Sequence, residues 1–68
     1  MDSQLLKSYI VRYDGTQAKL AEAMGISLSA LNAKINETNG AEFKQNEICF
    51  IKKRYNLSDS DVNACFFA

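Results

Sequence analysis

The chain has 68 residues, of which 47% are hydrophobic and 24% charged, and its eight basic and eight acidic residues cancel. This length holds one small domain, since a chain this short buries only about 60% of its unfolded surface on folding. The composition excludes a disordered or fibrous chain. Because the apolar runs are far too short to span a bilayer and the N-terminus has no basic start before an apolar core, we expect no membrane partner and a cytoplasmic location.

The residues that carry most enzyme chemistry are scarce. There is no histidine, so the two thiols, Cys49 and Cys65, can form neither a zinc site nor a Cys-His nucleophile. A disulfide between them would suit an exported protein, and without a signal we expect two reduced, buried residues. The glycines stand singly and the carboxylates are scattered. We therefore expect no enzyme, no metal and no cofactor.

The first predicted helix runs from Ser3 to Tyr13. Asp2 or Ser3 can cap its start, and the pair Asp14-Gly15 ends it. Its apolar residues recur at helical spacing and form one inward stripe: Leu5, Leu6, Tyr9, Ile10 and Tyr13.

A short second helix of about nine residues is predicted to start after Thr16, which is a good N-cap. Leu20, Ala21 and Met24 share one face of it. Gly25 ends it, because glycine readily takes the left-handed conformation in which many helices close.

A third helix is predicted from Leu28 to Asn36. Ser27 caps its start, and Leu31 stands where it can fold back on Ile26 as a hydrophobic staple. Leu31 and Ile35 continue the inward face. The polar residues 37–42 that follow contain an Asn-Gly pair, which predicts a turn with one residue of positive φ.

The fourth helix has an unusual start. Glu47 stands where a capping-box glutamate belongs, but the cap itself is Lys44, which cannot accept the bond that serine or threonine would. A bound phosphate is one candidate reason for a lysine there. The inward stripe consists of Ile48, Ile51 and Tyr55.

Phe50 is left over from the predicted core. It lies about 200° round the helical wheel from Ile48, since each residue advances about 100°.

A fifth helix is predicted through about Phe66. Ser58 caps its start, and Asp61, three residues later, completes a capping box. Phe67 is surplus at its end. Val62, Cys65 and Phe66 share its inward face. The fold class is thus all-α, a compact five-helix domain over residues 1–68.

The second and third helices together have the spacing of a helix-turn-helix. A small residue at Ala21 lets the two helices cross closely, and a glycine at Gly25 allows the turn. Ile26 and Leu31 then fill the angle between the helices. The alternative is two packed helices in a small bundle.

The segment QAKLAEAMGISLSALNAKIN resembles the helix-turn-helix of the phage Cro and CI repressor family, also called the Xre family. The downstream segment FKQNEICFIKKRYNLSDSDVNACFF is similar to small stand-alone members from temperate phages and prophages of Gram-positive bacteria. There, an F-T-x-x-E-I helix start is followed by L-S-x-x-D/E-I and a final F-F. The resemblance covers residues 5–67 and implies a lambda-repressor-like domain that binds operator DNA as a two-fold dimer.

The resemblance also implies roles for individual residues. Gln17 matches the family's phosphate-contacting glutamine, and the start of the third helix would enter the major groove. The residues placed nearest the bases are Ser27, Leu28 and Ser29, with Asn32 and Ala33 one turn further along. The residues placed beside the phosphate backbone are Lys34, Asn36 and Lys44.

The residue types suit base reading, and each also has a plainer explanation. Asn32 can offer a donor and an acceptor to adenine, while Leu28 and Ala33 can touch a thymine methyl group. Alternatively, Leu28 extends the core stripe, Ser27 serves only as a cap, and Asn32 is a solvated helix residue.

Two functions remain open from the sequence. The first is a Cro-like transcriptional regulator associated with the nucleoid, which binds operator DNA as a homodimer on half-sites about 34 Å apart. Its dimer contacts would come from Phe50, Phe66 and Phe67, unless Phe66 is buried in its own chain. The second is a small modulator that uses the same fold to bind a phage repressor protein, an alternative that the zero net charge favours.

Overall fold

The computed structural model describes residues 1–67, which form five α-helices and one short 3₁₀ helix and contain no β-strand. The helices are α1 Ser3–Tyr13, α2 Gln17–Met24, α3 Leu28–Asn36, η1 Thr38–Gly40, α4 Gln45–Tyr55 and α5 Asp59–Phe66. The prediction of an all-α fold is confirmed, and all five predicted helices are present. Throughout residues 1–67, every helix is too short or too polar to pass through a bilayer.

Four of the helices begin at a side chain that accepts a hydrogen bond from a backbone N–H three residues later. The caps are Asp2 for α1, Thr16 for α2, Ser27 for α3 and Ser58 for α5. Each satisfies one of the N–H groups that the first turn of a helix leaves without a partner. The hydroxyl of Ser3, the other candidate cap of α1, donates instead to the backbone oxygen of Ile35, at 2.7 Å.

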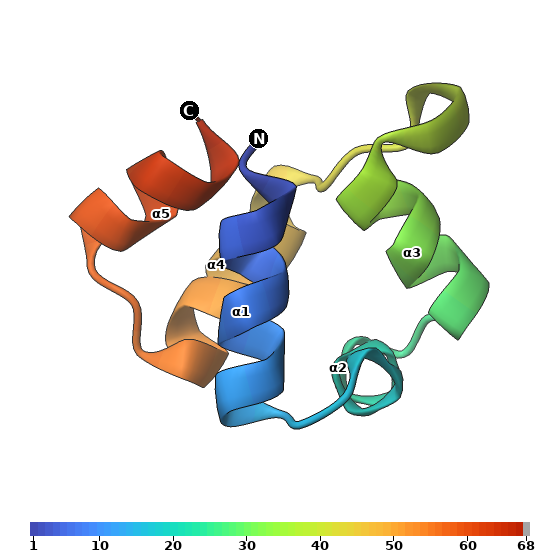
Figure 1. Cartoon of the computed structure of the whole chain (residues 1–68), viewed down its shortest axis with the longest axis horizontal. Helices are drawn as coiled ribbons and strands as arrows, with labels where there is room; N and C mark the ends of the chain where they lie inside the picture. The colour runs from blue at the N-terminus through green and yellow to red at the C-terminus, as the bar shows by residue number, and fades with distance from the viewer. Residues whose placement is uncertain (68) are drawn as a thin grey trace.

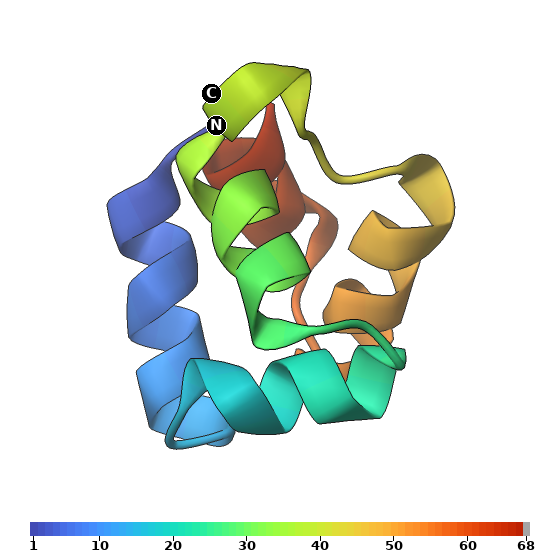
Figure 2. The ribbon, with the colours of Figure 1, turned by 90° about the vertical axis from the view of Figure 1, so that its right-hand side faces the viewer.

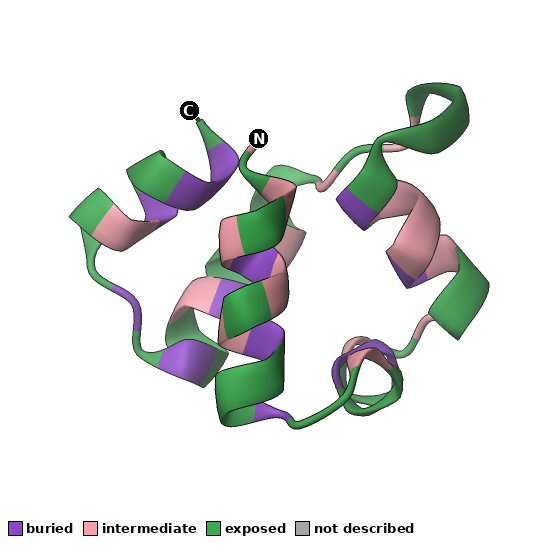
Figure 3. Ribbon diagram, in the orientation of Figure 1, coloured by how far each residue is buried: buried purple, intermediate pink, exposed green. Residues whose placement is uncertain are grey.

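The helices surround one apolar core. Figure 1 shows α1 and α4 in the middle, with α5 on one side and α2 and α3 on the other. The start of α1 and the end of α5 lie together, and the backbone N–H of Asp2 donates to the oxygen of Cys65 at 2.7 Å. Buried residues face inward from every α-helix (Figure 3). The buried hydrophobic residues are Leu6, Ile10, Leu20, Ala21, Leu31, Ile35, Ile48, Ile51, Tyr55, Leu57, Val62, Cys65 and Phe66.

The turn between α2 and α3 depends on Gly25, whose φ is +74°. The N–H of Gly25 donates to the oxygen of Glu22, and the N–H of Ile26 donates to the oxygen of Ala21. A left-handed residue at this point closes α2 and sends the chain into α3 at a new angle. Ala21 is only 2% exposed. The mechanical roles that the sequence suggests for Ala21 and Gly25 therefore fit the structure.

Three sequence expectations need correction. Cys49 is exposed, because it lies on the side of α4 away from Ile48 and Ile51; only Cys65 is buried, and both thiols are free. Tyr13 is 47% exposed, since it lies at the end of α1 and stacks on Tyr55 with ring centroids 5.1 Å apart. The turn after α3 holds three residues of positive φ rather than one: Glu37, Asn39 and Gly40.

Burial also decides the reactivity of Cys65. Loss of hydration raises the pKa of its thiol to about 11, because the thiolate cannot be solvated in the core. Cys65 is therefore a reduced packing residue and not a nucleophile.

Candidate nucleic-acid interface

Helix α3 has one apolar side in the core and one polar, uncharged side on the surface. Leu31 and Ile35 are fully buried. The opposite side, together with Thr38 of η1, lines a shallow hollow with Ser29, Asn32, Ala33 and Asn36. In Figure 2, α3 lies at the front of the molecule. This side of α3 is therefore not covered by another helix of residues 1–67.

The first turn of α3 is the most exposed part of this surface. Ser27, Leu28 and Ser29 are all exposed, and 44% of the Leu28 surface is in contact with solvent. The interpretation of Leu28 as a core residue is therefore wrong. Ser27 Oγ accepts from the N–H of Ala30 at 3.1 Å, which leaves its hydroxyl hydrogen able to donate to a ligand.

Helices α2 and α4 begin on opposite sides of α3 (Figure 2). At the start of α2, Gln17 is partly buried and Lys19 is exposed. At the start of α4, Lys44 is exposed and has no ion-pair partner among residues 1–67. The N-terminus of an α-helix carries a partial positive charge, so both starts are favourable places for an anion.

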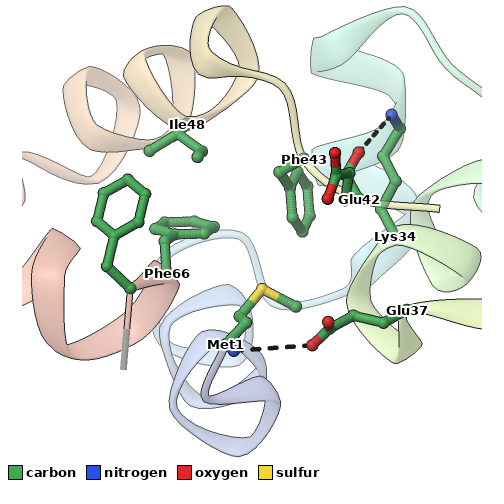
Figure 4. A pocket seen from close by; sticks show the side chains of 8 residues that line it. Met1, Lys34, Glu37, Glu42, Phe43, Ile48 and Phe66 are labelled. Atoms are coloured by element: carbon green, nitrogen blue, oxygen red, sulfur yellow. Dashed lines mark hydrogen bonds and ion pairs between the residues drawn. The ribbon is translucent and has the colours of Figure 1, made fainter. Parts of the chain in front are cut away.

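Lys34 is held within the protein, unlike Lys19 and Lys44. Its Nζ lies 3.0 Å from Oε1 of Glu47 and 3.3 Å from the backbone oxygen of Glu42, and only 16% of its side chain is exposed. Figure 4 shows the bond to Glu42 at the edge of a small pocket. The ammonium group thus ties the end of α3 to the start of α4, so it is not a free charge on the surface.

The same contacts explain the start of α4. Burial alone would raise the pKa of Glu47, but the backbone N–H of Lys44, at 2.8 Å, and the ammonium of Lys34 outweigh burial and lower that pKa. The Glu47 half of a capping box is therefore present, while the Lys44 side chain takes no part in it. The Lys44 side chain is left free to point into solvent or toward a ligand.

The surface around α3 is not basic overall. Residues 16–47 contain three lysines and four glutamates, a net charge of −1. Non-specific DNA affinity depends mainly on cations that neutralise phosphates. One copy of this surface therefore offers few cationic phosphate contacts.

The structure separates the three phenylalanines that the sequence groups together. Phe66 is only 8% exposed and packs edge-on against Phe43, with ring centroids 5.5 Å apart (Figure 4). It belongs to the core of its own chain because α5 turns it inward with Val62, so it cannot serve a dimer contact. Phe50 is 38% exposed, as the helical wheel predicts, and Phe67 is 59% exposed, but the two line separate hollows.

A polar cluster that the sequence does not reveal joins α1 to α4. The carboxylate of Asp14, only 4% exposed, receives hydrogen bonds from Arg54 Nε at 3.1 and 3.2 Å, from an Arg54 terminal nitrogen at 2.5 Å, and from the hydroxyl of Tyr55. The bonds from Arg54 lower the pKa of Asp14, against the effect of burial and with help from Tyr55. The cluster stabilises the fold and lies outside the α3 surface.

Residues 1–67 bring together no three His, Cys, Asp or Glu side chains that could hold a metal ion. Comparisons of the chain with protein-family models, with curated proteins and with solved structures give no match. The residues and geometry of the α3 surface therefore carry the information on function.

Proposed function

We propose that this protein is a Cro-like transcriptional regulator that inserts α3 into the major groove of operator DNA. The observation that carries the proposal is the α3 surface: a helix anchored by two fully buried residues, Leu31 and Ile35, that exposes small polar side chains on its other side. A helix can read base edges only if it is exposed along one side and held rigidly along the other.

The neighbours of α3 support this orientation. Hydrogen bonds to phosphate and sugar fix the register of most DNA-binding domains. The starts of α2 and α4, with Gln17, Lys19 and Lys44, lie on the two sides of α3 and can contact the two phosphate strands that border a groove. Asn36 is exposed at the other end of α3. Lys34 is left out of this set because Glu47 holds it.

The local charge of −1 implies that a single copy binds weakly. Two linked copies on adjacent half-sites gain affinity, because the second contact becomes intramolecular. We therefore propose a dimer on DNA. Its contacts would use Phe50 or Phe67, the two exposed phenylalanines, and not Phe66.

The net charge of −1 over residues 16–47 also supports a second candidate function. A small modulator that binds a phage repressor would need an apolar contact residue rather than cations. Leu28 is exposed by 44%, and Lys34 is neutralised by Glu47. An apolar contact surrounded by polar residues is typical of protein interfaces, whose buried centre is more apolar than their rim.

A titration of labelled DNA at several salt concentrations separates the two functions. With the DNA upstream of the protein's own gene, we expect Asn32→Ala to weaken binding roughly tenfold, the value of one good base contact. Lys44→Ala should weaken binding to all sequences and reduce the slope of log K against log salt by about one.

Asn63→Ala is the matched control for Asn32→Ala, because Asn63 is exposed on α5, on the other side of the molecule. It should leave DNA affinity unchanged. Phosphate contacts are strong at about 50 mM salt. If neither this DNA nor random duplex binds there, the proposal of a transcriptional regulator is wrong, and a modulator that binds a phage repressor becomes the better explanation.

A further inference from the structure

The outward side of α3 has a narrow chemical range. The side chains there are the exposed hydroxyls of Ser27 and Ser29, the half-buried amide of Asn32, the exposed amide of Asn36, and the apolar groups of Leu28 and Ala33. No residue from 27 to 33 is charged. The nearest cation along the chain, Lys34, is bonded to Glu47 and to the backbone of Glu42.

A G·C pair therefore finds no strong partner on this helix. Guanine is read in the major groove mainly by the paired donors of arginine or lysine, and cytosine by the carboxylate of aspartate or glutamate. Serine hydroxyls bond to any base and do not distinguish the pairs. The exposed part of α3 has hydroxyls and lacks both of the groups specific for G·C.

An A·T pair finds two partners. The Asn32 amide matches N7 and the N6 amino group of adenine, which present one acceptor and one donor. Leu28 and Ala33 offer apolar surface to the C5 methyl group of thymine, the one apolar group in the major groove. Leu28 is well placed for this contact because it is exposed at the first turn of α3.

We infer that α3 reads A·T base pairs, so that the operator half-site is rich in A·T where α3 contacts it. This inference rests on the proposed function. It names the class of DNA that the surface recognises: major-groove edges with thymine methyls and with the adenine N6 amino group beside N7, rather than guanine O6 beside N7.

Selection from duplexes with a randomised half-site tests the inference first. The positions that α3 reads are those at which the base preference disappears in the Asn32→Ala and Leu28→Ala variants. We expect A·T pairs to be enriched at these positions. If G·C pairs are enriched at those positions, the inference is overturned while the proposed function stands. If no sequence is enriched and nothing binds at low salt, the proposed function itself fails.

Base analogues in the best selected duplex then test the two contacts. Replacing the contacted thymine with deoxyuridine removes only the methyl group and should weaken binding about fourfold, the value of one buried methyl group. Replacing the contacted adenine with 7-deazaadenine removes N7 and should weaken binding roughly tenfold.

The matched variants supply the controls for the analogues. The Asn32→Ala protein should bind the adenine and 7-deazaadenine duplexes equally, and the Leu28→Ala protein should lose most of its sensitivity to deoxyuridine. If A·T pairs are selected but neither analogue changes the affinity of the unmodified protein, DNA shape is being read instead of base edges. That result also overturns the inference.

Discussion

Replacing Leu31 with alanine is expected to lower the free energy of unfolding by about 3 kcal/mol, the typical cost of a cavity at a buried leucine. Leu31 is fully buried and anchors α3 to the core. A domain of this size has a free energy of unfolding of roughly 3–10 kcal/mol, so the substitution should remove between about a third and all of it. Urea denaturation followed by far-ultraviolet circular dichroism measures the loss.

Leu28→Ala is the matched control, since it makes the same chemical change three residues earlier on the same helix. Leu28 is exposed by 44%, so its truncation should change the free energy of unfolding by no more than about 0.5 kcal/mol. Equal losses at the two positions would mean that the assigned inward and outward sides of α3 are wrong.

Replacing Asp14 with alanine is expected to lower the free energy of unfolding by about 2 kcal/mol near neutral pH. The substitution leaves the hydroxyl of Tyr55, which is buried, without its acceptor, and an unsatisfied buried polar group costs about 1–3 kcal/mol. Arg54 adds less to the loss, because its side chain is 37% exposed and water can replace the carboxylate. Thermal or urea unfolding measures the change.

The contribution of Asp14 to the free energy of unfolding should decrease as the pH is lowered. Its pKa is lower in the folded protein than in the unfolded chain, chiefly because of Arg54. Its contribution is therefore complete above the unfolded value, about 4, and is lost as pH falls through the lowered folded value. A stability difference between the wild type and Asp14→Ala that grows in acid would contradict the assigned ion pair.

Asp59→Ala is the control for an ion pair on the surface. Asp59 pairs with Lys52, but 87% of its side chain is exposed. Its loss should cost much less than the loss of Asp14, because water screens the two charges of an exposed pair. The contrast between Asp14 and Asp59 tests whether burial decides which ion pair matters.

Much of the fold follows from short-range signals in the sequence. Thr16, Ser27 and Ser58 cap helices in the structure because a side-chain oxygen near a helix start meets a free N–H wherever the rest of the chain lies. Gly25 closes α2 for a similarly local reason. Helical spacing likewise separates Ile48 and Ile51, which are buried, from Phe50, which is exposed.

The features that sequence reasoning misses depend on contacts between distant residues. Asp14 and Arg54 are 40 positions apart, and only the folded chain brings the ends of α1 and α4 together. Lys34 looks like a free cation in the sequence, but the chain returns through the start of α4 and brings Glu47 to it. The charge available to a ligand near α3 is therefore lower than a count of lysines suggests.

The central claim, that the outward side of α3 contacts DNA, is tested most directly by backbone amide chemical shifts. The isotope-labelled protein would be titrated with the best duplex from the half-site selection. The account predicts the largest changes at Ser27, Ser29, Asn32 and Ala33 and at the start of α2, with little change along α5. Largest changes along α5 or around Phe50, with α3 unaffected, would contradict it.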